Sequence, residues 1–232
     1  PVGYTMNTTK GRAELTSIVA VLTQKTALAT FTHTMAFAAF TAGAFMAGVS
    51  GWLLAKKRHE EVLKPTLKLG LVTVLVSFLI VGLTGDWSAR VMTEQQPMKM
   101  AAAEALYNTE SGAPFSLFTV GTLDGSKSVF QIGIPKMLSF LSTGNFNGSV
   151  EGINDLQAKY EQQYGPGNYK PIIPIAYWGF RLMIGFGAIA FLFSLIALYQ
   201  IRRRGVPTGK WFVPAMVWMP FLPLLANSMG WI

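Results

Sequence analysis

Three residues with chemically versatile side chains lie within otherwise apolar stretches of this sequence. His33 belongs to FTHTM at residues 31–35, and Arg181 and Met183 belong to FRLM at residues 180–183. Ionisable residues inside apolar segments of this kind are rare and usually functional. A histidine nitrogen and a methionine thioether together can ligate low-spin haem iron, so His33 and Met183 are a candidate ligand pair.

The same residues also permit simpler interpretations. A lone histidine in an apolar helix can form a helix–helix hydrogen bond or line a polar path, and Met183 can fill a packing gap. Arg181 is more informative, because a buried guanidinium needs an anionic partner, which a haem propionate would supply. Positions 181 and 183 point about 200° apart on a helix, so Arg181 would reach the rim of the macrocycle.

A second candidate site lies in the long polar segment between these stretches, where residues 96–104 read QPMKMAAAE. A quinol site needs a donor to an oxygen and a base that accepts a hydroxyl proton. Lys99 and Glu104 could fill these roles, with Gln96 as a further polar contact. Proline and alanine at the following positions favour a helix, on which Lys99 and Glu104 are about 140° apart. The alternative is a solvated surface helix with scattered charge.

The elements that must position these residues are membrane-spanning helices. The composition is 51% hydrophobic and only 13% charged, and several stretches of about 20 residues contain almost no charge. We predict an all-α integral membrane protein that is part of a larger helical bundle. Its segments are a surface or lead-in helix (1–24), a transmembrane helix (25–55), a cytoplasmic link (56–64), a transmembrane helix (65–85), a long extracytoplasmic loop (86–170), a transmembrane helix (171–201), a cytoplasmic link (202–210) and a transmembrane helix (211–232).

The orientation of these helices follows from the charges in their links. Residues 56–68 contain five lysines or arginines and residues 202–210 contain four, which predicts a cytoplasmic position for both links and an outer position for the long loop. His33 then lies roughly 12 Å below the outer end of its span, and Met183 roughly 18 Å. Because span ends vary by about two to four residues, both side chains can reach one level.

Charge and cysteine content limit the other classes. The net charge of +8 is concentrated in the short links, so it indicates membrane orientation and not nucleic-acid binding. The absence of cysteine excludes disulfides, thiolate-ligated iron–sulfur clusters and a cysteine nucleophile. Because the chain begins at Pro1 without methionine and ends at Ile232 without a polar tail, we expect it to be a segment of a longer membrane protein.

The motifs of the chain resemble subunit I of the cytochrome bd-type quinol oxidases. They are FTHT (31–34), GD (85–86), QPMK (96–99) with AAAE (101–104), FRLM (180–183) with Gly185, and GW (230–231). The resemblance covers the whole chain and corresponds to the central and later part of that subunit. It implies that His33 and Met183 are the axial ligands of a low-spin haem b, that Arg181 lies at the same haem, and that Trp231 lies between this haem and the high-spin haems.

The resemblance also implies roles for the polar segment. The loop at 86–170 would be the quinol-binding loop in the shorter of its two forms, with Lys99 and Glu104 functional in quinol oxidation and Gln96 as a further polar position. The chain would be the part of a terminal respiratory quinol:oxygen oxidoreductase at which electrons arrive from quinol. They would pass through the low-spin haem towards the oxygen-reducing haems, and protons would be released outside.

The wider complex follows from the same resemblance. It would lie in the bacterial cytoplasmic membrane, contact lipid, use ubiquinol or menaquinol, and contain b-type and d-type high-spin haems. A second large subunit and small accessory subunits are the expected partners, and nucleic acid is not. The family's N-terminal helices are absent, and a further haem-ligating glutamate would follow Trp231, so oxygen reduction is not expected from this segment alone.

Two alternatives remain at the level of the sequence. A dehydrogenase cytochrome subunit would also bind haem b and react with quinone, but such anchors typically ligate haem with two intramembrane histidines, and only His33 is intramembrane here. A non-redox transporter or channel segment would use His33 and Arg181 to line a path, and it predicts no bound cofactor.

Overall fold

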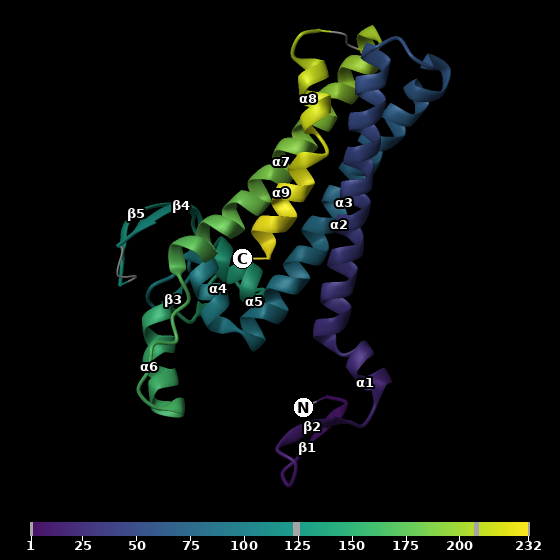
Figure 1. Ribbon diagram of the computed structural model, residues 1–232. Coiled ribbons are helices and arrows are strands. Elements are labelled where there is room, and N and C mark those ends of the chain that lie inside the picture. Colours follow the sequence, from purple (N-terminus) through teal and green to yellow (C-terminus); the bar gives the residue numbers. More distant parts are fainter. Residues whose placement is uncertain (1, 123–125, 207–208, 232) are drawn as a thin grey trace.

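The computed structural model describes residues 2–122, 126–206 and 209–231, and it is mostly helical (Figure 1). The predicted segments 1–24, 86–170, 202–210 and 211–232 each include a few residues outside this description. Four helical segments in the described residues are long and apolar enough to cross a membrane. They are α2 (Lys25–Ala55), α3 (Glu60–Gln95), α7 (Ile173–Arg204) and the broken pair α8 (Phe212–Trp218) and α9 (Phe221–Gly230).

The helices pack as a bundle with the long polar segment at one end and the two short links at the other (Figure 1). Small residues bring α2 and α3 close together. A methyl group built on Gly70 of α3 would lie 2.7 Å from the backbone nitrogen of Ala47, and one built on Gly43 would lie 3.0 Å from the Gly70 carbonyl oxygen. Close approach at small residues is how transmembrane helices associate when the lipid offers no hydrophobic driving force.

Two buried clusters hold the rest of the bundle together. Towards the short links, α2, α3, α7 and α8 meet around Leu67, Leu71, Ala197 and Phe212. Nearer the middle, Phe40, Val74, Ala190 and Met219 form a second cluster, beside which the Phe78 and Phe191 rings of α3 and α7 stack at 4.7 Å. Helix α9 lies along α7 (Figure 1). These contacts fix the helices that carry the candidate haem ligands.

The polar segment is a folded unit and not an open loop. It contains α4 (Pro97–Glu104), α5 (Met137–Thr143) and α6 (Ile153–Tyr164). Within the described part of the chain it also contains two antiparallel strand pairs, β3 (Glu110–Ser111) with β6 (Ser149–Val150) and β4 (Phe115–Gly121) with β5 (Ser128–Ile134). These strands are an addition to the predicted all-α architecture, because the turn-rich composition of the segment did not reveal them.

The N-terminal part also differs from the predicted helix over 1–24. An antiparallel hairpin of β1 (Tyr4–Asn7) and β2 (Arg12–Leu15) comes first, and helix is confined to α1 (Ile18–Thr23). Asn7 accepts hydrogen bonds from the backbone of the turn, in which Gly11 has a φ of +59°, and Ser17 caps the short helix. The helical spacing of Leu15 with the apolar residues of α1 was therefore misleading, since Leu15 is the last residue of a strand.

The spanning helices differ from the predicted segments mainly at their ends. Helix α3 is longer than residues 65–85, because residues 86–95 continue the helix to Gln95. The last span is interrupted between Trp218 and Phe221, where Pro220 precedes α9 and has no amide hydrogen to continue the helical ladder.

Candidate functional site

The site begins where α3 ends and the polar segment starts. Gln96 adopts a non-helical conformation between α3 and α4, and Pro97 follows at the first position of α4, where its missing amide hydrogen costs nothing. The helix ends at Glu104, and the residue that caps it, Ala105, has a left-handed φ of 50°. The alanines of α4 pack with Met98 in a buried cluster that includes Ile153 of α6 and Tyr177 of α7. Small side chains thus bring α4 against the start of α7.

Glu104 is the last residue of α4 and is buried, with 2% of its surface exposed. Its Oε2 atom accepts a hydrogen bond from Arg181 Nη2 at 2.5 Å and another from the Ser116 backbone amide at 3.3 Å. The Arg181 side chain is only 9% exposed, so both charges of this pair are removed from water. The anionic partner that the sequence required for Arg181 is, within the described chain, Glu104.

Hydroxyl groups extend this arrangement. The Ser116 Oγ atom lies 2.8 Å from the Tyr177 hydroxyl and 2.6 Å from Thr119 Oγ1, and all three residues are buried. Tyr177 is one helical turn before Arg181, so both side chains lie on the same face of α7. Through them this face contacts the Glu104 carboxylate of α4 and Ser116 of strand β4. Buried polar networks of this kind fix geometry when their members are satisfied.

Arg181 retains unused hydrogen-bonding capacity. Its Nε and Nη1 atoms are buried and have no hydrogen-bond partner among the described residues. The guanidinium lies over the rings of Phe115, Tyr177 and Phe180, at 4.6, 5.0 and 5.1 Å from their centroids. Aromatic faces stabilise the cation but do not satisfy its N–H groups. An additional anionic or carbonyl oxygen would therefore complete this environment.

The burial of Glu104 alters its acidity. Desolvation raises the pKa of the Glu104 carboxyl to about 7, although Arg181 and the Ser116 amide favour the ionised form. A carboxylic acid with a pKa near neutrality can exchange a proton at physiological pH, as a general base requires.

Lys99 and Gln96 occupy a different position from Glu104. Both side chains are exposed, and neither forms a hydrogen bond or ion pair with another described residue. The predicted separation of Lys99 and Glu104 around one helix thus places one on the outer face and the other against α7. Their joint role at a quinol remains a prediction.

His33 lies half-buried on α2 against α3. Its Nδ1 atom is 3.1 Å from Thr84 Oγ1, and the Thr84 hydroxyl donates its hydrogen to the Ile80 carbonyl oxygen at 2.8 Å. This arrangement favours the tautomer in which Nδ1 carries the imidazole hydrogen and donates it to Thr84 Oγ1. This tautomer leaves Nε2 with the lone pair that a metal ligand needs. Gly85 leaves room beside the ring, since a methyl group there would lie 3.3 Å from His33 Cε1.

Met183 lies half-buried on α7 against the end of α9. A methyl group built on Gly230 would lie 2.8 Å from the Met183 sulfur, so the methionine side chain packs closely against this glycine. Trp231, the next residue, is 83% exposed. Met183 is ten residues into α7, about 15 Å along its axis, and His33 is eight residues into α2, about 12 Å. Both depths are counted from the helix end that lies on the side of the polar segment.

The residues present fit the haem that the sequence motifs imply. The contact of His33 Nδ1 with Thr84 leaves Nε2 available as a ligand, and Arg181 has two buried N–H groups without partners among the described residues, which suit a propionate. Methyl groups built on Gly82 of α3 or Gly185 of α7 would meet nothing within 4 Å in the described structure. His33 contacts α3, and Met183 lies against the end of α9.

Sequence reasoning missed the pairing of Glu104 with Arg181 and the roles of Ser116 and Tyr177. The pair is separated by 77 residues, so no local pattern links its members. The sequence contains only indirect indications of this site. Arg181 required an anionic partner, and Tyr177 lies one helical turn before Arg181 on α7.

Comparison with known proteins decides the family. The sequence matches the family described as "Cytochrome bd terminal oxidase subunit I" over residues 1–232. The chain belongs to this family. It is 39% identical to "Cytochrome bd ubiquinol oxidase subunit 1" of Bacillus subtilis (strain 168), over 100% of this chain and 49% of that protein. It is 24% identical to "Cytochrome bd-II ubiquinol oxidase subunit 1" of Escherichia coli (strain K12), over 100% of this chain and 56% of that protein.

Fold comparison agrees with the family. The structure of bd oxidase from Geobacillus thermodenitrificans matches with a TM-score of 0.83 and 24% sequence identity, over 100% of this chain and 51% of the matched chain. The chain therefore spans about half the length of these relatives. The prediction of a helical multi-pass membrane protein related to the cytochrome bd oxidases is confirmed, and the transporter and dehydrogenase-anchor alternatives lose their support.

Proposed function

We propose that this segment of cytochrome bd oxidase subunit I oxidises quinol beside α4 and passes the electrons to a low-spin haem b held between α2 and α7. The observation that carries the proposal is the buried carboxyl of Glu104, which has a pKa of about 7 and is held by Arg181 of the helix that carries Met183. The names of the relatives in Bacillus subtilis and Escherichia coli support quinol as the substrate.

The proton chemistry belongs to the residues of α4. Oxidation of a quinol to a quinone releases two electrons and two protons, and each hydroxyl proton needs an acceptor. The ionised Glu104 carboxylate would accept one such proton, and Arg181 and the Ser116 amide would hold it in place. Lys99 would bind an oxygen of the substrate from the exposed side of α4, and Gln96 would add a polar contact at the helix start.

The haem would be held by residues on two helices, α2 and α7. His33 Nε2 and the Met183 sulfur would ligate the iron, and the free N–H groups of Arg181 would bind a propionate. The group supplies one-electron redox chemistry when bound, and a thioether ligand raises its reduction potential. Thr84 fixes the His33 ring through Nδ1, and such outer partners orient a ligand and set its basicity. Trp231 would lie on the electron path towards the b-type and d-type high-spin haems of the intact complex.

The membrane orientation follows from the charges. The two basic links would be cytoplasmic and the folded polar segment would face the outside of the bacterial cytoplasmic membrane. Quinol protons would then leave outside, while those for water formation come from within. A second large subunit, with or without small accessory subunits, would complete the complex, in which ubiquinol or menaquinol is the donor.

The test is quinol oxidation by the intact complex carrying Glu104→Gln or Lys99→Gln. We expect Glu104→Gln to lower the rate by about 100-fold or more, because it removes the base. Lys99→Gln should act mainly on the KM for quinol. The matched controls are Glu110→Gln and Lys159→Gln, which alter exposed charges elsewhere in the same segment. If both site variants oxidise quinol at the parent rate with an unchanged haem spectrum, the site assignment is wrong.

A further inference from the structure

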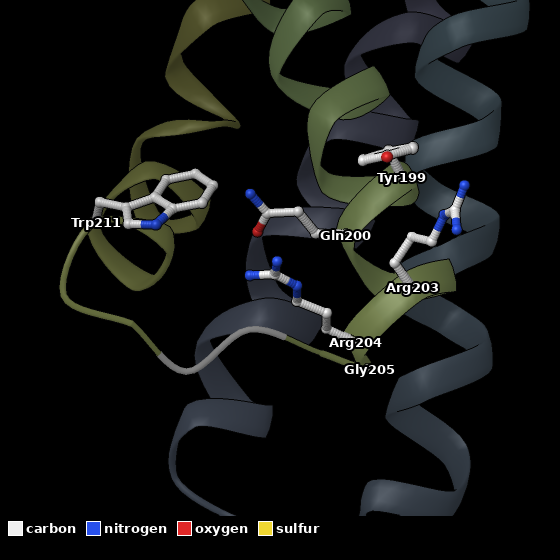
Figure 2. A pocket seen from close by; sticks show the side chains of 6 residues that line it. All are labelled: Tyr199, Gln200, Arg203, Arg204, Gly205 and Trp211. Carbon is white, nitrogen blue, oxygen red and sulfur yellow. The ribbon is translucent and has the colours of Figure 1, made fainter.

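A basic pocket lies at the end of α7 that is remote from the proposed quinol site. Helix α7 ends in Arg202, Arg203 and Arg204, at the end of the bundle opposite the polar segment (Figure 1). An open pocket of about 760 Å³ adjoins this helix end. Its lining residues, shown in Figure 2, are Tyr199, Gln200, Arg203, Arg204, Gly205 and Trp211.

The pocket is cationic without an internal counter-charge. None of the ion pairs among the described residues involves Arg202, Arg203 or Arg204, and no carboxylate lines the pocket. Arginines at a helix C-terminus are favourable towards the helix dipole, which alone explains a basic helix end. The helix dipole does not explain why these arginines lie beside a pocket that is lined by aromatic side chains.

The aromatic walls are held in place by their neighbours. The Arg203 guanidinium lies 5.6 Å from the centre of the Tyr199 ring. The Trp211 ring makes edge contacts with Phe193 and Phe212, at 6.1 and 5.7 Å. In Figure 2 the side chains of Gln200 and Arg204 extend from α7 towards Trp211, whereas Tyr199 and Arg203 lie on the other side of this helix. Tyrosine and tryptophan beside arginine are typical of the level at which a helix leaves the bilayer.

We propose that this pocket binds the phosphate headgroup of an anionic phospholipid. Arginine forms paired hydrogen bonds with phosphate oxygens, and basic pockets beside transmembrane helices suit anionic headgroups. A lipid is the occupant and not free phosphate, because the turns of α7 that precede the pocket residues carry exposed apolar side chains. Leu192, Leu195 and Ile196 of α7 are exposed within the preceding turns and provide a surface for acyl chains.

The test uses the intact oxidase complex in detergent, with native mass spectrometry to count bound lipid. Dioleoylphosphatidylglycerol and dioleoylphosphatidylcholine are added in turn to the parent protein and to Arg203→Gln with Arg204→Gln. We expect the parent to retain phosphatidylglycerol in preference to phosphatidylcholine, and the double variant to bind phosphatidylglycerol roughly fivefold more weakly for each arginine removed.

The matched control is Lys57→Gln with Arg58→Gln, which removes two exposed charges from the link at the same end of the bundle. Equal loss in this control would contradict the proposal, since the effect would then be general surface charge. Equal retention of both lipids by the parent protein would also overturn it, and that result needs no variant. Displacement of the lipid by inorganic phosphate would show a free-anion site instead of a lipid site.

Discussion

At the scale of single residues, Glu104 and Arg181 form a buried ion pair, and each side chain affects the charge state of the other. Burial disfavours the carboxylate and the guanidinium favours it, and the balance leaves the pKa of Glu104 at about 7. A partly exposed glutamate would remain ionised throughout the physiological range. The sequence indicated that both residues were functional candidates but not that they meet, since the fold of the whole polar segment brings α4 to α7.

This balance predicts a pH dependence for quinol oxidation. Glu104 must be ionised to accept a proton, so the rate should rise with pH, reach half its maximum near the pKa of about 7 and level off above it. Arg181→Gln removes the partner that favours ionisation, so the pKa of Glu104 rises and the midpoint should move to higher pH. The measurement is the pH profile of kcat in the intact complex. A midpoint that stays in place or falls in Arg181→Gln would contradict this account of the pair.

At the scale of elements, the apolar runs of the sequence predicted the helices better than the turn residues predicted the strands. The four apolar runs predicted the spanning helices well, because a segment in lipid must satisfy its backbone within itself. Residues 86–95 have the polarity of a loop but continue α3, where Val91 is buried and the Ser88 hydroxyl donates to the Ala29 carbonyl oxygen of α2. The strand pair of β4 and β5 could not be predicted from the sequence. Its alternation of apolar and polar residues is weak, and many apolar residues of β5 are exposed.

The packing of α2 on α3 predicts an unequal tolerance of two glycines on the same helix. Gly70 faces the α2 backbone at distances that exclude a side chain, whereas a methyl on Gly82 meets nothing within 4 Å. Gly70→Leu should therefore lower stability by about 1–3 kcal/mol or disrupt the pair of helices, and Gly82→Leu should have little effect on packing. Thermal unfolding of the purified complex, followed by helical circular dichroism, measures the difference. Equal losses for the two variants would show that the close approach of α2 and α3 is not what limits stability.

At the scale of the whole molecule, the chain spans about half the length of its relatives, and the two ends of its helix bundle differ in charge. One end carries the folded polar segment with Glu104, and the other carries the basic links. The sequence predicted this polarity from charge counts alone. It could not predict how the candidate haem ligands are held, because the tautomer of His33 depends on the hydrogen bond of Thr84 to Ile80 across the helix pair.

The absence of cysteine from this chain makes its orientation directly measurable. Glu110→Cys in the polar segment and Arg203→Cys at the basic end are each treated with a membrane-impermeant maleimide on intact cells. We expect the first to be labelled at once and the second only after permeabilisation, because the positive links should be cytoplasmic. The parent protein, treated in parallel, gives the background. Immediate labelling of Arg203→Cys alone would reverse the orientation and move the quinol site to the inner face.

The most direct test of the central claim is a reduced-minus-oxidised visible spectrum of the intact complex with His33→Ala and Met183→Ala. Because His33 and Met183 are proposed to ligate one low-spin haem b, each variant should lose or alter the same low-spin signal. Leu182→Ala, which changes an exposed neighbour on α7, should leave that signal unchanged. A low-spin signal that survives both ligand variants would contradict the proposal that this segment holds the haem that receives electrons from quinol.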